Sequence, residues 1–403
     1  MKKIVGIIAA AALATSAFAE INIGSWNRGV FVPFHYDGDT LRSLEGPSWA
    51  VGSTGGVRTG LSFSASSENA GFVFDFHGNP GAQIAMGDNA YTWVKPVDML
   101  TLKFGKMDNN WGRLDHCFGT WNYWRFSNER GEGLAGVERQ KGCGAEITLQ
   151  PVEGLVIDYE ANFWGDTYKL DGALTYNADG TVKVKEDTKA NHTYEVMWEH
   201  SSTMIGYQAD FGFIRAIING QSATKYDAGD SDTKPAALIG VAADITAIEN
   251  LTLKVGVSLP TYLQSSNSFV KAAVAADYNL DALALHAQVS LDVLPNKKKS
   301  DSNYTLGNMG FNIGAGVDYA FSDAWKLVTD FRFQSWSNTT TESDGADTKI
   351  KLEDPSFGGY IGLEQSLSNA SFAFGAMFGK RSMTSAKADD FTFAVPLTMT
   401  VAF

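Results

Sequence analysis

The chain ends in the stretch FTFAVPLTMTVAF, residues 391–403. Seven large apolar residues alternate there with smaller or polar ones, from Phe391 to Phe403. Successive side chains of a strand point to opposite faces. This pattern therefore predicts a strand with one face in an apolar environment and the other in a more polar one. A tilted strand needs about 9–11 residues to cross the hydrocarbon core of a bilayer. The closing stretch, with 13 residues, is long enough to span it.

Taken alone, the same alternation also suits a half-buried strand of a soluble sandwich. The terminal Phe403 is a further clue, because with it the stretch resembles the C-terminal signal of bacterial outer-membrane β-barrels. In that family a final Phe on the lipid face marks the closing strand for insertion. The resemblance implies a bacterial outer-membrane location, surrounding outer-membrane lipid and recognition by the barrel-assembly machinery.

The first 19 residues read as a cleaved secretory signal. Lys2 and Lys3 precede an apolar run over residues 4–14, and Ala17-Phe18-Ala19 forms a small-x-small cleavage site. The run is too short for a transmembrane helix, and no later stretch reaches the about 18 apolar residues that one needs. We expect residues 20–403 to form a single domain that crosses the membrane as strands.

The composition suits a barrel with alternating faces. Glycine (41) and the aromatic residues Phe (25), Tyr (14) and Trp (10) are abundant, and the mean hydropathy is only −0.13. The mean hydropathy of a barrel does not reveal its apolar lipid face, because polar lumen residues alternate with the apolar ones. Without Lys2 and Lys3 the chain has 30 basic (32 less 2) and 45 acidic residues, a net charge of −15. This balance argues against nucleic-acid binding and mildly favours cations as cargo.

Regular alternating rows recur along the whole chain, and we expect 18 strands, or 16 if two segments are loop. Eight short turns separate nine longer connections, and this order is typical of outer-membrane barrels with short periplasmic turns. The predicted fold is therefore an all-β, transmembrane, antiparallel up-and-down barrel. The short turns are expected at residues 67–69, 96–98, 151–154, 200–203, 246–250, 279–282, 321–324 and 366–369. The rows lie within 21–34, 57–65, 72–76, 91–93, 100–104, 145–149, 155–163, 194–198, 205–213, 239–245, 251–259, 270–278, 283–293, 311–319, 325–333, 357–363, 372–378 and 391–403.

Pro396 is the one misfit in the closing strand, because proline has no backbone N–H to donate to a neighbouring strand. We expect a bulge or a frayed pair there.

A barrel of 16–18 strands is too wide for its wall side chains to fill, so the default consequence is a water-filled channel. At full length the chain resembles a bacterial porin. The resemblance implies passive diffusion of ions and small hydrophilic solutes, no enzymatic activity, no cofactor and a homotrimer.

Among the long connections between the predicted rows, residues 108–141 form the third along the chain and the longest. In porins the third external loop commonly folds inward and narrows the pore. The alternative is a folded external cap whose aromatic residues form a small core. The candidate constriction residues are Arg113, Asp115, Trp121, Tyr123, Trp124, Arg125 and Arg130.

Cys117 lies in this connection and Cys143 at its return to the sheet, and two cysteines in a secreted chain most simply form one disulfide. A metal site would need more nearby ligands, so none is expected. Charges on the polar face of the rows are candidates for the lumen wall, where they would act on ions in a narrow passage. These wall residues are Arg58, Lys103, Asp158, Glu160 and Glu195.

An outer-membrane hydrolase and a surface adhesin are the alternative functions. A hydrolase would need a Ser or Asp beside a His near the rim, but the six histidines are scattered without a G-x-S-x-G elbow. The adhesin alternative rests on aromatic residues in the outer loops.

Overall fold

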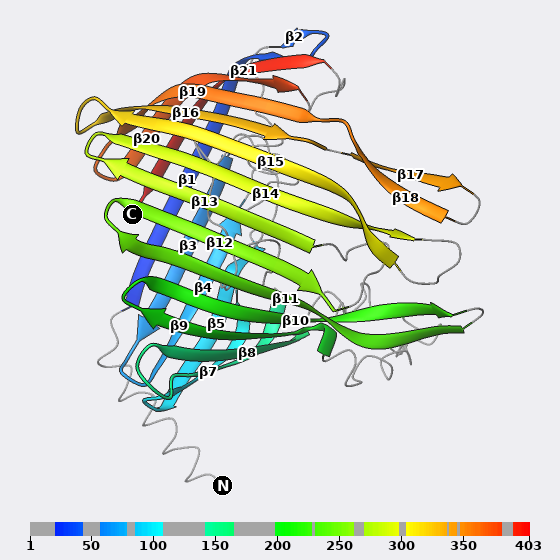
Figure 1. Cartoon of the computed structure of the whole chain (residues 1–403). Helices are drawn as coiled ribbons and strands as arrows, with labels where there is room; N and C mark the ends of the chain where they lie inside the picture. Colours follow the sequence, from blue (N-terminus) through cyan, green and yellow to red (C-terminus); the bar gives the residue numbers. More distant parts are fainter. Residues whose placement is uncertain are drawn as a thin grey trace, which may run out of the picture.

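A computed structural model gives the architecture of the chain (Figure 1). The structure describes residues 21–42, 57–78, 85–107, 142–164, 198–227, 230–261, 270–297, 304–336, 338–344, 347–380 and 390–403. The expected signal over residues 1–19 and all seven candidate constriction residues lie outside these ranges. Cys117 and the side chain of Cys143 lie outside them too.

The described strands form one antiparallel sheet of 21 strands. Without the short β2 (Leu41–Arg42) and the projecting pair β17 (Asn338–Asp344) and β18 (Asp347–Glu353), 18 strands remain, and they close into a barrel. The all-β barrel expected from the sequence is confirmed. The barrel strands are β1 (Ile21–Tyr36), β3 (Val57–Ser66), β4 (Ala70–Gly78), β5 (Ala85–Val97), β6 (Leu100–Met107), β7 (Gly142–Leu149), β8 (Leu155–Trp164), β9 (Ser201–Ala209), β10 (Gly212–Asp227), β11 (Asp230–Ile248), β12 (Leu251–Pro260), β13 (Val270–Leu280), β14 (Leu283–Lys297), β15 (Tyr304–Ala320), β16 (Trp325–Gln334), β19 (Ser356–Ser366), β20 (Ala370–Lys380) and β21 (Phe391–Ala402).

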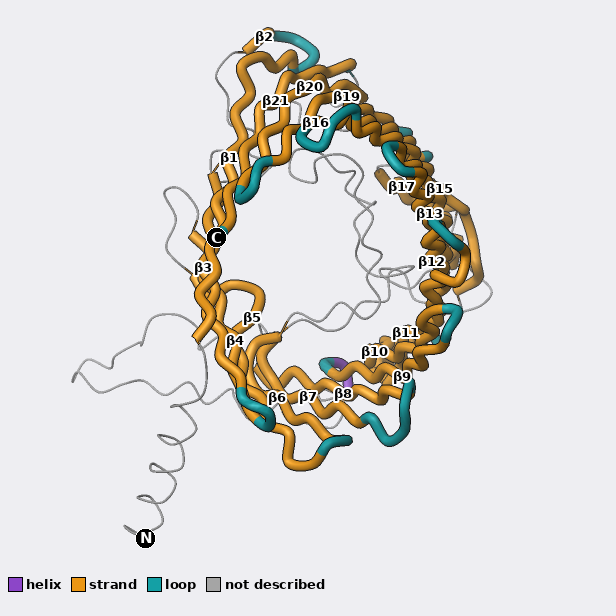
Figure 2. Tube along the Cα trace, turned by 90° about the vertical axis from the view of Figure 1, so that its left-hand side faces the viewer, coloured by secondary structure: helices purple, strands orange, loops and turns teal. Residues whose placement is uncertain are grey.

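The first and last strands close the barrel. β1 pairs with β3 along one edge and with β21 along the other. At the junction the N–H of Ser25 donates to the carbonyl of Phe403 and the N–H of Phe403 to that of Ser25, each at 2.8 Å. Figure 2 looks along the barrel and shows the described strands as a closed ring, with the C-terminus beside β1 and β3. Closure leaves the sheet without an open edge, which is the condition for a β-structure in lipid.

Pro396 interrupts the ladder as the sequence predicts. On the β1 side, Phe31 is paired with Leu397 and Phe34 with Val395, so the register shifts by one residue opposite the proline. On the β20 side, Phe374 pairs with Leu397 and the next pair is Met377 with Ala394. The missing donor is therefore accommodated by a bulge and a gap, and pairing resumes on both sides.

The two faces of the barrel have the polarity opposite to that of a soluble protein. Large apolar side chains of the outer face are exposed, for example Phe31 (43%), Tyr207 (50%) and Ile361 (50%). Charged side chains of the inner face are covered, and both Glu146 and Arg332 are 0% exposed. An outer surface of this kind suits an apolar solvent, whereas in water it would be an extended hydrophobic patch.

The sequence-based prediction is wrong around residues 198–213, whereas residues 194–197 of the expected row 194–198 lie outside the described ranges. The predicted row 205–213 is not one strand, because a turn at residues 210–211 separates β9 from β10. Phe213 pairs with Gln208 across this turn and so joins the inner face, not the outer row with Ile205. The turn expected at residues 200–203 is the start of β9, and residues 198 and 199 are helical where a strand was expected.

The row expected at residues 91–93 places its two aromatic residues, Tyr91 and Trp93, on the inner face and not on an apolar outer face. Trp93 pairs with Lys103 and Tyr91 with Gly105, and paired residues of neighbouring strands share a face. Both aromatic rings thus belong to the inner face, and the ammonium of Lys103 lies 5.8 Å from the centroid of the Tyr91 ring. The outer residue between them is Thr92, which pairs with Phe104.

The short turns lie together at one end of the barrel, and the longer connections leave from the other (Figure 1). At that second end β10 and β11 extend beyond their neighbours as a two-stranded hairpin, paired from Gly212 with Ile245 to Asp227 with Asp230. β17 and β18 form a second projecting hairpin. The sequence predicts this alternation of short turns with long connections. The inner face therefore lies between an end of short turns and an end of longer connections.

Gly212→Ala is expected to destabilise the barrel at the corrected β9–β10 turn. Gly212 has φ +134°, and a Cβ there would lie 1.9 Å from the carbonyl oxygen of Asp244. Residues other than glycine in such a conformation cost about 1–3 kcal/mol before the clash is counted. Urea unfolding of the refolded protein in lipid vesicles, followed by tryptophan fluorescence, measures the loss. Gly29→Ala is the matched control, since a Cβ at Gly29 meets nothing within 4 Å. Equal unfolding midpoints for the two variants would contradict the turn geometry.

Candidate functional site

The inner face of the barrel is the candidate site, and two arcs of charged residues lie on it. The first arc is on β6, β7 and β8. Lys103 pairs in register with Glu146, and Glu146 with Glu160, so their side chains form one row. The ammonium of Lys103 lies 2.5 Å from Glu146 Oε1. Asp158 lies two residues from Glu160 on the same face and is also buried.

Three of the five wall residues named from the sequence thus come together in this arc. They are Lys103, Asp158 and Glu160, and the sequence analysis missed their neighbour Glu146. Of the other two, Arg58 pairs with Arg28 through the backbone, but its side chain lies outside the described part of the chain. Glu195 is not among the described residues. The first arc has three carboxylates and one ammonium, so it is acidic.

The second arc is a row of charged side chains near the short-turn end of the barrel, which we call the charge belt. Every member lies within four residues of the end of its strand at a short turn. Eight neighbouring strands contribute one residue each, and basic and acidic side chains alternate without exception. The members are Arg215 (β10), Asp244 (β11), Lys254 (β12), Asp277 (β13), His286 (β14), Asp318 (β15), Lys326 (β16) and Glu364 (β19).

Strand register produces this alternation. Asp244 pairs with Lys254, and Asp277 with His286. Lys326 pairs with Glu364. Because paired residues share a face, these three basic groups lie beside an acidic one on the next strand. Arg215 pairs in register with Ala242 and reaches Asp244, two residues further along β11, diagonally.

Direct contacts join three neighbouring pairs of the charge belt, one at each end and one in the middle. Arg215 Nη1 donates to Asp244 Oδ2 at 2.8 Å. Nδ1 of His286 lies 2.6 Å from Asp277 Oδ1. Lys326 Nζ lies 3.1 Å from Glu364 Oε1.

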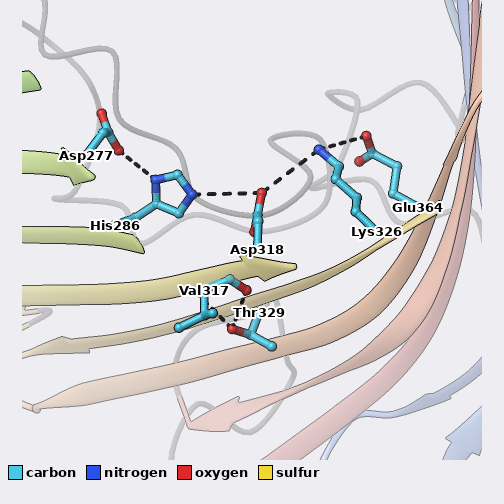
Figure 3. Close-up of polar contacts among 7 residues, drawn as sticks. All are labelled: Asp277, His286, Val317, Asp318, Lys326, Thr329 and Glu364. Carbon is cyan, nitrogen blue, oxygen red and sulfur yellow. Dashed lines mark hydrogen bonds and ion pairs between the residues drawn. The ribbon is translucent and has the colours of Figure 1, made fainter. Parts of the chain in front are cut away.

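Asp318 on β15 lies between His286 and Lys326 in the belt, and its contacts are longer. Its Oδ2 is 3.8 Å from His286 Nε2 and 3.9 Å from Lys326 Nζ. Figure 3 shows Asp277, His286, Asp318, Lys326 and Glu364 on one face of the sheet, with Val317 and Thr329 on the other. Both distances exceed the hydrogen-bonding range, so Asp318 attracts its neighbours through charge alone.

No protein-family profile matches the sequence, and no curated protein is similar enough to match it. Solved structures match over most of the chain. Outer-membrane-expressed OmpT of Vibrio cholerae is 11% identical, with a TM-score of 0.44, and the match covers 96% of this chain and 98% of that one. An anion-selective porin from Comamonas acidovorans is 10% identical, with a TM-score of 0.46, over 96% and 100%. OccD1 (OprD) is 10% identical, with a TM-score of 0.47, over 95% of each chain.

The architecture of the chain resembles that of bacterial outer-membrane porins. One structure of the Vibrio cholerae protein is described as its trimer form. No helix in the described ranges is long and apolar enough to cross a membrane.

Asp277 and His286 form a described acid–histidine pair that can be compared with a hydrolytic centre. Asp277 and His286 resemble the base and its orienting acid in a hydrolase triad. However, the second ring nitrogen of His286 faces the carboxylate of Asp318, where a triad would place the hydroxyl or thiol of a nucleophile. The described ranges also hold no group of three or more His, Cys, Asp and Glu residues that could bind a metal ion.

A buried ion pair lies between the charge belt and the longer connections. Arg332 and Asp330 are two residues apart on β16, and both guanidinium contacts to Asp330 Oδ2, from Nε at 3.0 Å and Nη2 at 2.8 Å, are hydrogen bonds. Their side chains are 1% and 0% exposed. Sequence could have indicated this pair, because residues two apart on a strand share a face.

Arg332→Met is expected to lower the free energy of unfolding by about 3–5 kcal/mol, because it leaves the buried carboxylate of Asp330 without its cation. Urea unfolding of the refolded barrel measures the change. The double variant Arg332→Met/Asp330→Asn removes the uncompensated charge and is expected to lose clearly less stability than the single one. The single variants Arg332→Met and Asp330→Asn each lose some free energy of unfolding. If the loss in the double variant equals the sum of these two losses, Arg332 and Asp330 are not energetically coupled, and the buried ion pair is disproved.

Proposed function

We propose that this chain is a bacterial outer-membrane protein whose barrel forms a water-filled channel for passive diffusion of ions and small hydrophilic solutes. The observation that carries the proposal is the polarity of the closed 18-strand barrel, with apolar residues outside and charged residues inside. Barrels of about 16–18 strands enclose an aqueous lumen, because side chains from the wall cannot reach across it. The outer face then contacts lipid, and every barrel strand is paired on both edges.

The described part of the wall supports cation preference. The acidic arc of Glu146, Asp158 and Glu160 has one described basic neighbour, Lys103, while the charge belt has four acidic and four basic members. Net negative charge along a lumen raises the local concentration of cations.

Single-channel recording tests this function directly. The refolded protein in a planar bilayer is expected to give stable ohmic steps, and its reversal potential in a salt gradient should indicate cation preference. Protein unfolded by heat is the control. Absence of conductance from a barrel that still shows heat-modifiable migration on a gel would disprove the channel and turn attention to the adhesin and hydrolase alternatives.

We further propose that the connection 108–141 narrows the pore. Its sequence supports this, because it holds many aromatic residues and four arginines, a composition better suited to packing against the inner wall than to a freely solvated loop. Arginines there would face the acidic arc and shape the field in the passage.

Replacing Arg113 and Arg125 together with Ser is expected to raise the conductance and strengthen cation preference, because two positive charges leave the narrow passage. Conductance and reversal potential in the planar bilayer measure both effects. Lys297→Ser is the control, since Lys297 lies at the end of β14 facing a long connection. Unchanged conductance and selectivity in the double variant would rule out the constriction.

A further inference from the structure

The charge belt has a property that the acidic arc lacks, since its charges cancel over a short distance. Four basic and four acidic side chains alternate along it. Neighbouring strands are about 4.8 Å apart, so the sign of the charge reverses at every strand. The potential of such a row falls steeply away from the wall, because each charge is opposed by its neighbours. The belt therefore has little effect on an ion in the middle of the lumen, and acts on solutes that touch the wall.

A solute with both charges fits such a row better than a simple ion. A small zwitterion carries an ammonium and a carboxylate a few bonds apart. Its ammonium can lie beside an acidic member while its carboxylate lies beside the basic member on the next strand. A simple cation or anion at the same place meets one attractive and one repulsive neighbour.

Asp318 and Lys326 can make further contacts of this kind. Among the described residues, Asp318 Oδ2 makes two long contacts, to His286 at 3.8 Å and to Lys326 at 3.9 Å. Lys326 has three N–H donors, and its closest described acidic partner is Glu364. The side chains of Asp318 and Lys326 are 23% and 36% exposed, so both can be reached from the lumen.

We propose that the end of the charge belt formed by Asp318, Lys326 and Glu364 is a contact site for small zwitterionic solutes such as amino acids. This proposal rests on the open channel proposed above. A weak site of this kind speeds passage of the solute that it holds, provided that the solute also leaves easily.

Liposome swelling tests the proposal with two isomeric solutes, zwitterionic β-alanine and uncharged lactamide. The ratio of their swelling rates cancels differences in the number of inserted channels. Lys326→Gln/Glu364→Gln removes one basic and one acidic member and leaves the net charge unchanged. It is expected to lower the β-alanine to lactamide ratio about two- to fivefold, the range typical of a partly exposed charge pair. Lys326→Arg keeps the charge and is expected to keep the ratio.

Lys271→Gln/Asp292→Asn is the matched control. Lys271 and Asp292 form another cross-strand pair on the inner face, at 3.9 Å, outside the charge belt. The β-alanine to lactamide ratio of this control variant should equal that of the unchanged protein. If lactamide does not enter vesicles that hold the unchanged protein, the channel itself is disproved, and this inference with it. If lactamide enters but Lys326→Gln/Glu364→Gln leaves the ratio unchanged, the channel stands and the contact site is disproved.

Discussion

Pairing of every barrel strand on both edges is the constraint on which the rest of this structure depends. Backbone groups that face lipid must find partners inside the protein, because each unpaired one costs several kcal/mol. The two hydrogen bonds between Ser25 and Phe403 complete that pairing between residues from opposite ends of the chain. The same requirement explains why Pro396 is tolerated, since the bulge opposite it lets the ladder resume on both sides.

Closure also fixes where polar side chains can lie. Alternation along each strand sends one set of residues outward and the other inward, so the charges of 18 strands meet on one concave face. Register then decides which charges become neighbours. It gathers Glu146, Asp158 and Glu160 into an acidic arc beside Lys103, and it aligns the charge belt with alternating sign. One barrel thus has an arc in which acidic residues predominate and a row in which basic and acidic residues alternate.

Much of the fold could be predicted from local pattern, and the errors have identifiable causes. Around residues 205–213 the apolar alternation continues across a turn, because Phe211 and Phe213 keep the period of the preceding strand although Phe213 faces inward. Tyr91 and Trp93 were assigned by their apolar character, yet aromatic rings also line the lumen beside Lys103. Three wall residues, Lys103, Asp158 and Glu160, could be named from their own segments. Glu146 was missed, because only the pairing of its strand with both neighbouring strands places it among them.

The sequence by itself determined that this chain forms strands with one apolar face, because that information is contained in the period of two along each segment. It also indicated the closing strand, since the pattern and the terminal Phe403 are local. Only the tertiary structure decided which charges meet. The charge belt joins residues from Arg215 to Glu364, and a shift of one residue in any strand would turn its member to the outer face. Register is a relation between strands, so no single segment specifies it.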